Sequence, residues 1–118
     1  MKPKATIYYN PQCSKCRQTL ALLRARGIEP EIVEYLKKPL APAEISRLMD
    51  LLGGKAHDIL RIKEAAYGEK SLSESSTKDE IVRAIVENPI LMERPIVVVG
   101  EKAVIARPPE KSLPLLQA

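Results

Sequence analysis

The two cysteines of this chain lie at positions i and i+3 of one segment, Asn10-Pro11-Gln12-Cys13-Ser14-Lys15-Cys16-Arg17. They follow a strand-like run, residues 5–9, and open a segment whose pattern is helical from Ser14 onward. A thiol in the first turn of a helix meets unpaired backbone N–H groups and the positive end of the helix dipole, and both favour the nucleophilic thiolate. Cys13 and Cys16 share one helix face, close enough to form a disulfide after a small local adjustment. The pattern predicts thiol redox chemistry.

The length of 118 residues predicts a single domain, residues 1–118. Its core should be aliphatic, because the chain contains no Phe and no Trp. No stretch approaches the ~18 apolar residues of a membrane span. The start of the chain, Met1-Lys2-Pro3-Lys4, lacks the apolar region of a signal peptide. We therefore expect a cytoplasmic protein with no membrane partner. In a reducing compartment a Cys-x-x-Cys pair is more often catalytic than structural.

The charge pattern argues against a nucleic-acid partner, because the net charge is only +4 and no run of like charges resembles a basic arm. A modest positive charge is compatible with a small anionic substrate. One His and two Cys fall short of the four ligands of a zinc site, so no metal is predicted. We expect the lone histidine, His57, to be a surface or partly packed residue.

The first third of the chain predicts a β–α–β unit. The expected strands cover residues 5–10 and 31–35, and a helix over residues 14–26 ends at Gly27. Strand, helix and strand in this order imply a right-handed parallel crossover.

The middle of the chain predicts helices. The first begins at Pro42 and ends at Gly53-Gly54, a shorter helix covers residues 57–62, and the polar residues 68–76 are expected to form a loop. Thr77 to Glu80 form a capping box for a helix over residues 81–86.

The last third predicts strands over residues 95–99 and 102–106, joined by a type II′ turn at Gly100-Glu101. A C-terminal helix beginning at Pro108-Pro109 should be short or kinked, because Pro114 lies inside it. The element order predicts an α/β, thioredoxin/glutaredoxin-like fold: a mixed four-stranded sheet with an inserted helical region.

Several collinear blocks of the chain resemble the glutaredoxin-like arsenate reductase (ArsC) family, and the match extends from Thr6 to Leu116. The first block is the loop Asn10-Pro11-x-Cys13-x-x-x-Arg17. The others follow in order and at the family's spacing: Leu60-Arg61 before Tyr67, Asn88-Pro89-Ile90-Leu91, Arg94-Pro95-Ile96-Val97-Val98, and Arg107-Pro108.

The resemblance implies that Cys13 is the nucleophile and that Arg61, Arg94 and Arg107 bind the oxyanion. A guanidinium is always charged and forks onto two oxygens of arsenate, which lysine cannot do. The resemblance also implies supporting roles in the site, including a cis-proline that faces the active thiol. These supporting residues are Asn10, Arg17 and Pro95.

The resemblance further implies a reaction without a bound cofactor, in which glutathione is the reductant and glutaredoxin recycles the enzyme. The expected partners are therefore arsenate or a similar small oxyanion, glutathione and glutaredoxin. We expect the protein to be a monomer.

The chain departs from the family pattern at two positions. Tyr9 stands where better-studied members carry a His that helps to activate the thiol, so activation must depend on the arginines and the helix. Cys16 stands where a Ser is usual. It is a candidate resolving thiol for the adduct at Cys13, and the alternative is a buried cysteine that only packs.

Two other functions stay open at this stage. A general thiol–disulfide reductase of glutaredoxin type would use Cys13 and Cys16 as its dithiol, but gives the arginines little purpose. A Spx-like redox-sensing regulator shares the fold and a Cys-x-x-Cys switch, and acts by binding RNA polymerase. Arg61 and Arg107 at arsenate-reductase positions favour the oxyanion reductase.

Overall fold

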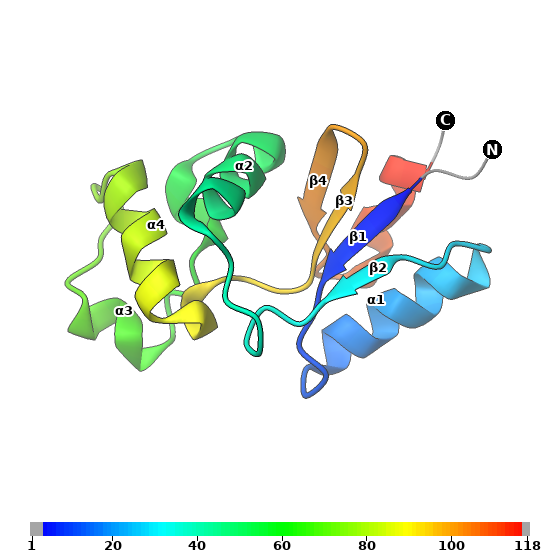
Figure 1. The fold of residues 1–118 in the computed structure, drawn as a ribbon, viewed down its shortest axis with the longest axis horizontal. Helices are drawn as coiled ribbons and strands as arrows, with labels where there is room; N and C mark the ends of the chain where they lie inside the picture. Colours follow the sequence, from blue (N-terminus) through cyan, green and yellow to red (C-terminus); the bar gives the residue numbers. More distant parts are fainter. Residues whose placement is uncertain (1–3, 117–118) are drawn as a thin grey trace. The chain divides into compact units, whose positions relative to one another are not determined.

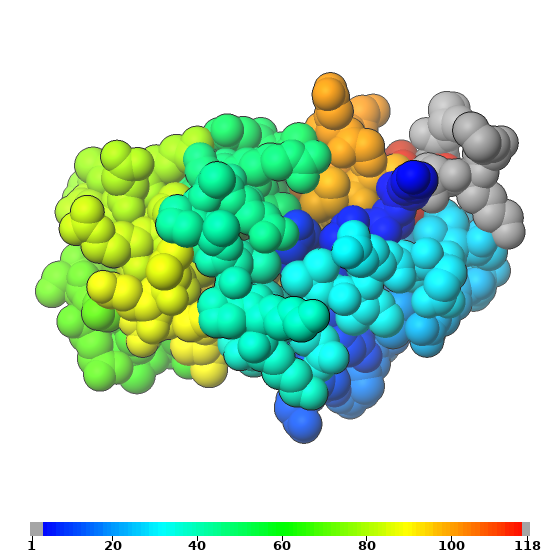
Figure 2. All heavy atoms as spheres, in the orientation of Figure 1, coloured from blue at the N-terminus to red at the C-terminus, as the bar shows by residue number. Residues whose placement is uncertain are grey.

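The computed structural model describes residues 4–116 and divides into two compact units. The sheet unit comprises the chain up to Lys38 and from Arg94 onward, and the helical unit is Pro39–Glu93. Figure 1 shows the strands of the sheet unit and the helices of the helical unit, and Figure 2 shows the heavy atoms of the same residues as spheres. In the described part of the chain, no helix is long and apolar enough to cross a membrane.

The sheet unit contains a mixed four-stranded sheet with the strand order β2-β1-β3-β4. The central strand β1 pairs in parallel with β2 and antiparallel with β3, and β3 pairs antiparallel with β4. This is the predicted α/β arrangement. The strands are β1 (Ala5–Tyr8), β2 (Glu31–Val33), β3 (Ile96–Val99) and β4 (Lys102–Ile105).

Helix α1 (Ser14–Ala25) packs on the sheet through its apolar stripe. Leu20 and Leu23 are buried against Ile7 of β1 and Val97 of β3. Burying one such side chain contributes about 1.5–3 kcal/mol, so this contact fixes the helix that follows the cysteine loop. The 3₁₀ helix η3 (Pro109–Leu116) contacts both α1 and the sheet.

Two turns of the sheet unit follow from their residues. Gly100 has a φ of 62°, the left-handed value required at the first position of the predicted type II′ turn. Strand β2 ends at Val33, before the predicted residue 35, because the chain turns at Glu34, whose carbonyl oxygen accepts from the N–H groups of Lys37 and Lys38.

The helical unit contains α2 (Pro42–Leu52), α3 (Ala65–Glu69) and α4 (Lys78–Glu87), with short 3₁₀ helices η1 (Ala56–Ile59) and η2 (Pro89–Leu91). Pro42 occupies the first turn of α2, where its missing N–H costs nothing. The predicted capping box is present: Glu80 N–H donates to Thr77 Oγ1 at 3.1 Å, and Thr77 N–H donates to Glu80 Oε1 at 2.7 Å.

Other predicted elements also differ from the structure in extent or in helix type. The helix over residues 57–62 ends at Ile59, because Leu60 forms a β-bridge with Met92 and Arg61 N–H donates to Leu91 O at 2.7 Å. The predicted loop over 68–76 begins with the last residues of α3. The C-terminal helix is a 3₁₀ helix, since Pro114 has no N–H for a continued α-helical ladder. Residues 1–3, where the sequence predicts no signal peptide, lie outside the described residues.

Candidate active site

The loop between β1 and α1 places Cys13 at the start of the helix. Cys13 is the N-cap residue of α1, with extended backbone angles, and its N–H donates to Asn10 O at 2.9 Å. Asn10 Oδ1 accepts from Gln12 N–H at 3.0 Å, and Arg17 Nη1 donates to Pro11 O at 2.8 Å. These contacts close the loop on itself and hold the sulfur of Cys13 above the first turn of α1.

The surroundings of Cys13 favour its thiolate. Burial raises the pKa of this half-buried thiol, but the nearby Cys16 N–H and thiol, the charge of Arg94 and the nearby Lys15 N–H together hold the pKa of Cys13 below its ordinary value. Cys13 Sγ accepts no side-chain cap hydrogen bond of standard geometry from the backbone N–H groups of α1. The sulfur therefore lies near several donors without a full hydrogen bond to any of these N–H groups. The predicted lowering of the Cys13 pKa is confirmed in direction.

Cys16 lies in the opposite environment. Its side chain is fully buried, on the inward face of α1. Burial and the neighbouring Cys13 sulfur together raise the pKa of Cys16 to about 12, against the lowering effects of Asn10 N–H and of the charge of Arg94. Cys13 and Cys16 are both free thiols. At neutral pH the pair is therefore one activated sulfur beside one protonated thiol.

Two of the predicted arginines lie at Cys13. Arg107, just after β4, donates from Nη1 to Cys13 Sγ at 3.8 Å and to Arg94 O at 3.2 Å. Arg94 precedes β3, and its charge acts on the Cys13 thiol. The Arg94–Pro95 bond is cis, as predicted, and the Arg107–Pro108 bond is cis as well, which the sequence reasoning missed.

The third predicted arginine, Arg61, belongs to the helical unit. Its Nη1 pairs with Glu64 Oε1 at 3.0 Å and donates to Ile90 O at 3.2 Å. In the same unit His57 Nε2 forms a hydrogen bond of 2.7 Å with Tyr67 Oη, and the two rings meet edge-on. His57 is thus the partly packed residue that the sequence predicted.

Tyr9 and Arg17 have structural contacts in the sheet unit. Tyr9 packs against the hydrophobic core of the sheet unit, so it does not replace the activating His. The guanidinium of Arg17 donates to the carbonyl oxygen of Pro11 and so stabilises the loop. A contact that sequence reasoning missed is Asn10 N–H to Cys16 Sγ, at 3.5 Å. The Asn-Pro turn ahead of a helix was the only available signal for it.

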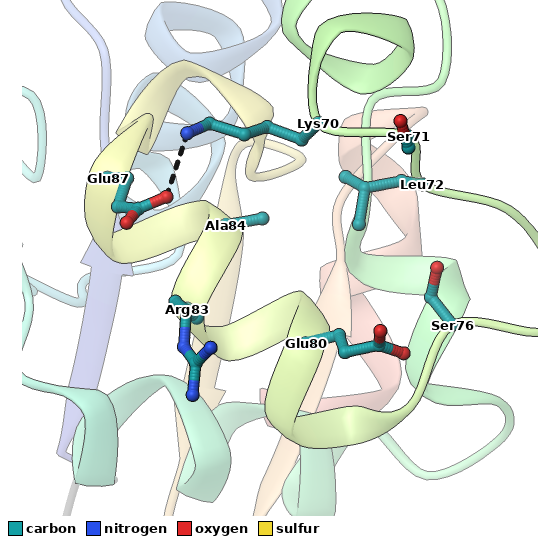
Figure 3. Close-up of a pocket in the computed structure, with 8 residues that line it drawn as sticks. All are labelled: Lys70, Ser71, Leu72, Ser76, Glu80, Arg83, Ala84 and Glu87. Carbon is teal, nitrogen blue, oxygen red and sulfur yellow. Dashed lines mark hydrogen bonds and ion pairs between the residues drawn. The ribbon is translucent and has the colours of Figure 1, made fainter.

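A cavity of about 170 Å³ lies within the helical unit, beside α4. Figure 3 shows the ion pair of Lys70 with Glu87 at one end of it, and Ser76 and Glu80 at the other. Its lining includes no thiol and no histidine. Among the described residues, no three His, Cys, Asp or Glu side chains gather in a group that would hold a metal ion.

Comparison with known proteins identifies the family of this chain. A family model described as the ArsC family matches residues 8–114. The chain belongs to the ArsC family. The predicted family is thereby confirmed over most of the chain.

Curated relatives of this ArsC-family chain cover almost its whole length. It is 47% identical to an Escherichia coli K12 protein described as uncharacterized protein YfgD, over 98% of this chain and 99% of the relative. It is 40% identical to a protein named arsenate reductase from Neisseria meningitidis serogroup A, over 92% of this chain and 94% of the relative.

A solved structure supports the same assignment. The structure titled arsenate reductase from Vibrio cholerae matches this ArsC-family chain with a TM-score of 0.93 and 39% sequence identity, covering 98% of this chain and 100% of that one. The predicted thioredoxin-like α/β fold with an inserted helical region is confirmed.

Proposed function

We propose that this protein is an arsenate reductase and that Cys13 is its nucleophile. Relatives named arsenate reductases, near 40% identity and close to full length, support the activity. The observation that carries the assignment of the site is the contact of Arg107 Nη1 with Cys13 Sγ at 3.8 Å, at the first turn of a helix. This geometry combines an activated thiol with a donor suited to an oxyanion.

Binding of arsenate is the first task of the site. Arg94 and Arg107 supply positive charge beside Cys13, and a guanidinium matches two oxygens of a tetrahedral oxyanion at once. The N-terminal turn of α1 adds backbone N–H groups of Lys15 and Cys16 near the same sulfur. These groups would hold the arsenic atom against the thiolate, so that the reaction becomes effectively intramolecular.

The first covalent step is attack of the Cys13 thiolate on arsenic. A sulfur–arsenic bond forms, and one arsenate oxygen leaves as hydroxide or water after protonation. Arsenic is still in its oxidised state in this adduct. Arg94 and Arg107 would stabilise the negative charge that spreads over the remaining oxygens.

The electron transfer needs a second thiol, and we propose glutathione. Its thiolate attacks the adduct, the sulfur–arsenic bond breaks, and arsenic leaves as arsenite with the two electrons. The two sulfurs are oxidised to a mixed disulfide between Cys13 and glutathione. Glutaredoxin would then reduce this disulfide by thiol exchange and return Cys13 to the thiolate.

The supporting residues have structural tasks in this proposal. Asn10 and Arg17 hold the loop that presents Cys13, through the contacts to Gln12 N–H and Pro11 O. Pro95 lies between Arg94 and β3, and the Arg94–Pro95 bond is cis. The role of Arg61 as a third oxyanion ligand stays a prediction of the resemblance.

The activity is tested by arsenate-dependent oxidation of NADPH, coupled through glutathione, glutathione reductase and glutaredoxin. We expect turnover that requires arsenate, glutathione and glutaredoxin, and that disappears in Cys13→Ser. The Cys13–Cys16 dithiol favours a second candidate, general disulfide reduction. Turnover of a small disulfide without any turnover of arsenate would replace the proposed function by this second one.

A further inference from the structure

The cavity beside α4 in the helical unit has an apolar middle. It lies between one face of α4 and the segment 70–76, which follows α3. Leu72 and Ala84 line it and are buried. The side chain of Lys70 reaches from this segment to α4, where its Nζ pairs with Glu87 Oε1 at 2.8 Å (Figure 3). Because the ammonium group is held there, the methylene stem of Lys70 adds a third apolar wall.

The backbone that carries this wall is fixed by the end of α3. Ser71 N–H donates to Gly68 O, and Leu72 N–H donates to Tyr67 O, each at 3.0 Å. These two hydrogen bonds form the Schellman pattern that closes a helix C-terminus, with Ser71 at the left-handed position and a φ of 55°. The position of Leu72 is therefore set by the backbone, and the cavity is preformed on this side.

The polar end of the cavity carries an anchored carboxylate, that of Glu80. Its Oε1 accepts from Thr77 N–H at 2.7 Å. The same N–H holds the pKa of Glu80 below its ordinary value, so the side chain is ionised at neutral pH. Among residues 4–116, no Lys or Arg forms an ion pair with this carboxylate. Glu80 thus places a negative charge without an ion-pair partner at the cavity.

Ser76 supplies a hydroxyl at the same end. Figure 3 shows the carboxylate of Glu80 directed toward Ser76. Ser76 Oγ accepts from Ser73 N–H at 2.9 Å, and Ser76 N–H donates to Ser73 O at 3.0 Å, so the hydroxyl oxygen is held in place. The hydroxyl keeps its hydrogen for donation. This end therefore offers one negative charge and one O–H donor.

The cations that line the cavity do not suit an anionic ligand. Lys70 is neutralised by its ion pair with Glu87. The guanidinium of Arg83 is directed away from Ser76 and Glu80 in Figure 3. A matching ligand instead carries an ammonium group for the carboxylate, an oxygen for the hydroxyl and an apolar chain for the middle.

We propose that this cavity binds a small amino alcohol with a branched apolar chain. The ammonium group pairs with the Glu80 carboxylate, the ligand hydroxyl accepts from Ser76 O–H, and the chain packs on Leu72 and Ala84. The cavity volume of about 170 Å³ equals that of roughly five or six waters, which limits the ligand to a small molecule. The inference goes beyond the proposed function and uses none of the residues assigned to arsenate.

The test is a titration of the full ¹⁵N-labelled chain with leucinol, which joins an ammonium group, a hydroxyl and a branched apolar chain. We expect saturable shifts of the backbone amide signals of Leu72, Ser76 and Ala84, with a Kd in the millimolar range. The matching diol, in which a hydroxyl replaces the ammonium group, should bind about fivefold more weakly or worse. Isopentylamine, which lacks the hydroxyl, should also bind more weakly than leucinol.

The protein variants separate the charge of Glu80 from its structural role. Glu80→Gln removes the charge but keeps an acceptor for Thr77 N–H, because Gln also serves in a capping box. Its affinity for leucinol should fall by about fivefold or more, while its urea unfolding curve stays near that of wild type. The matched control is Asp79→Asn, which removes a negative charge from the same helix turn outside the cavity lining and should bind like wild type.

The inference is overturned by any of four results. These are the absence of saturable shifts at the three amides, equal affinity for leucinol and the diol, equal affinity for leucinol and isopentylamine, and a loss in Glu80→Gln no larger than that in Asp79→Asn. The titration needs neither arsenate nor glutathione, so its outcome is independent of the proposed function.

Discussion

Arg107 lies 94 residues after Cys13 in the chain, and its Nη1 donates to Cys13 Sγ at 3.8 Å. The same nitrogen donates to Arg94 O at 3.2 Å, so Arg107 links the sulfur to the chain segment that enters β3. The sheet creates this contact, since β1, which leads to Cys13, pairs with β3, and β3 pairs with β4, which leads to Arg107. The site is therefore assembled by strand pairing.

Replacing Arg107 by Lys should impair arsenate turnover and leave the fold intact. Lysine keeps the charge but loses the forked pair of donors, and one charge-assisted hydrogen bond is worth about 1.5–3 kcal/mol, or roughly one to two decades in rate. The measurement is kcat/KM for arsenate in the coupled assay. Arg47→Lys, at an exposed position of α2, is the matched control. Wild-type kinetics in Arg107→Lys would remove this residue from the site.

Replacing Arg94 by Gln should raise the pKa of Cys13. Burial already raises this pKa, and the variant deletes one of the opposing contributions, the charge of Arg94, while it leaves the nearby donor groups of Cys16 and Lys15 in place. The alkylation rate of Cys13 should therefore fall at neutral pH and recover at higher pH. An alkylation profile that does not move with this substitution would mean that Arg94 does not act on the thiol.

The local features of the fold were predictable because each depends on neighbouring residues. The start of α1 after Cys13, the capping box of Thr77 and the turn at Gly100 all follow from short patterns, and all are present. The helix over residues 57–62 was mispredicted because Leu60 pairs with Met92, a distant partner that periodicity cannot reveal.

The candidate site was likewise only partly predictable from the sequence. The contrast between Cys13 and Cys16 was partly visible, since a helix start favours the thiolate of Cys13. The full burial of Cys16 and its contact with Asn10 N–H depend on how the loop packs. Arg94 and Arg107 were predicted as site residues only from the family resemblance. No sequence rule predicts that residues so far from Cys13 in the chain lie beside it in the fold.

The prediction for Arg61 can be separated from a structural role. Arg61 pairs with Glu64 at 3.0 Å and donates to Ile90 O at 3.2 Å, so its loss will disturb the helical unit to some degree. If Arg61 also binds arsenate, Arg61→Lys should lower kcat/KM for arsenate by roughly tenfold or more. Glu64→Gln, which breaks the same ion pair, should leave kcat/KM near wild type. Equal kinetic losses in both variants would indicate a structural role alone.

The buried thiol of Cys16 should make stability fall at alkaline pH. Its pKa in the folded protein is raised to about 12 from an ordinary 9.0, so the unfolded chain releases this proton first. The stabilising contribution is fully present below pH 9.0 and is lost as pH rises from there toward 12, with a slope of up to about 1.4 kcal/mol per pH unit.

This alkaline loss is measured by urea unfolding at a series of pH values on either side of 9.0. Cys16→Ser should lose less stability than wild type over that range, because its hydroxyl does not ionise there. Cys13→Ser keeps Cys16 and should retain the steeper fall. Parallel curves for wild type and Cys16→Ser would show that Cys16 ionises equally in both states.

A single-turnover experiment without glutaredoxin tests the central claim most directly. Protein, arsenate and glutathione are mixed, arsenite is quantified, and the site of glutathione attachment is mapped by peptide mass spectrometry. We predict one arsenite formed for each glutathione bound to Cys13, with neither product when arsenate is omitted or in Cys13→Ser. Arsenite without modification of Cys13, or glutathione on Cys13 to the same extent without arsenate, would contradict the account.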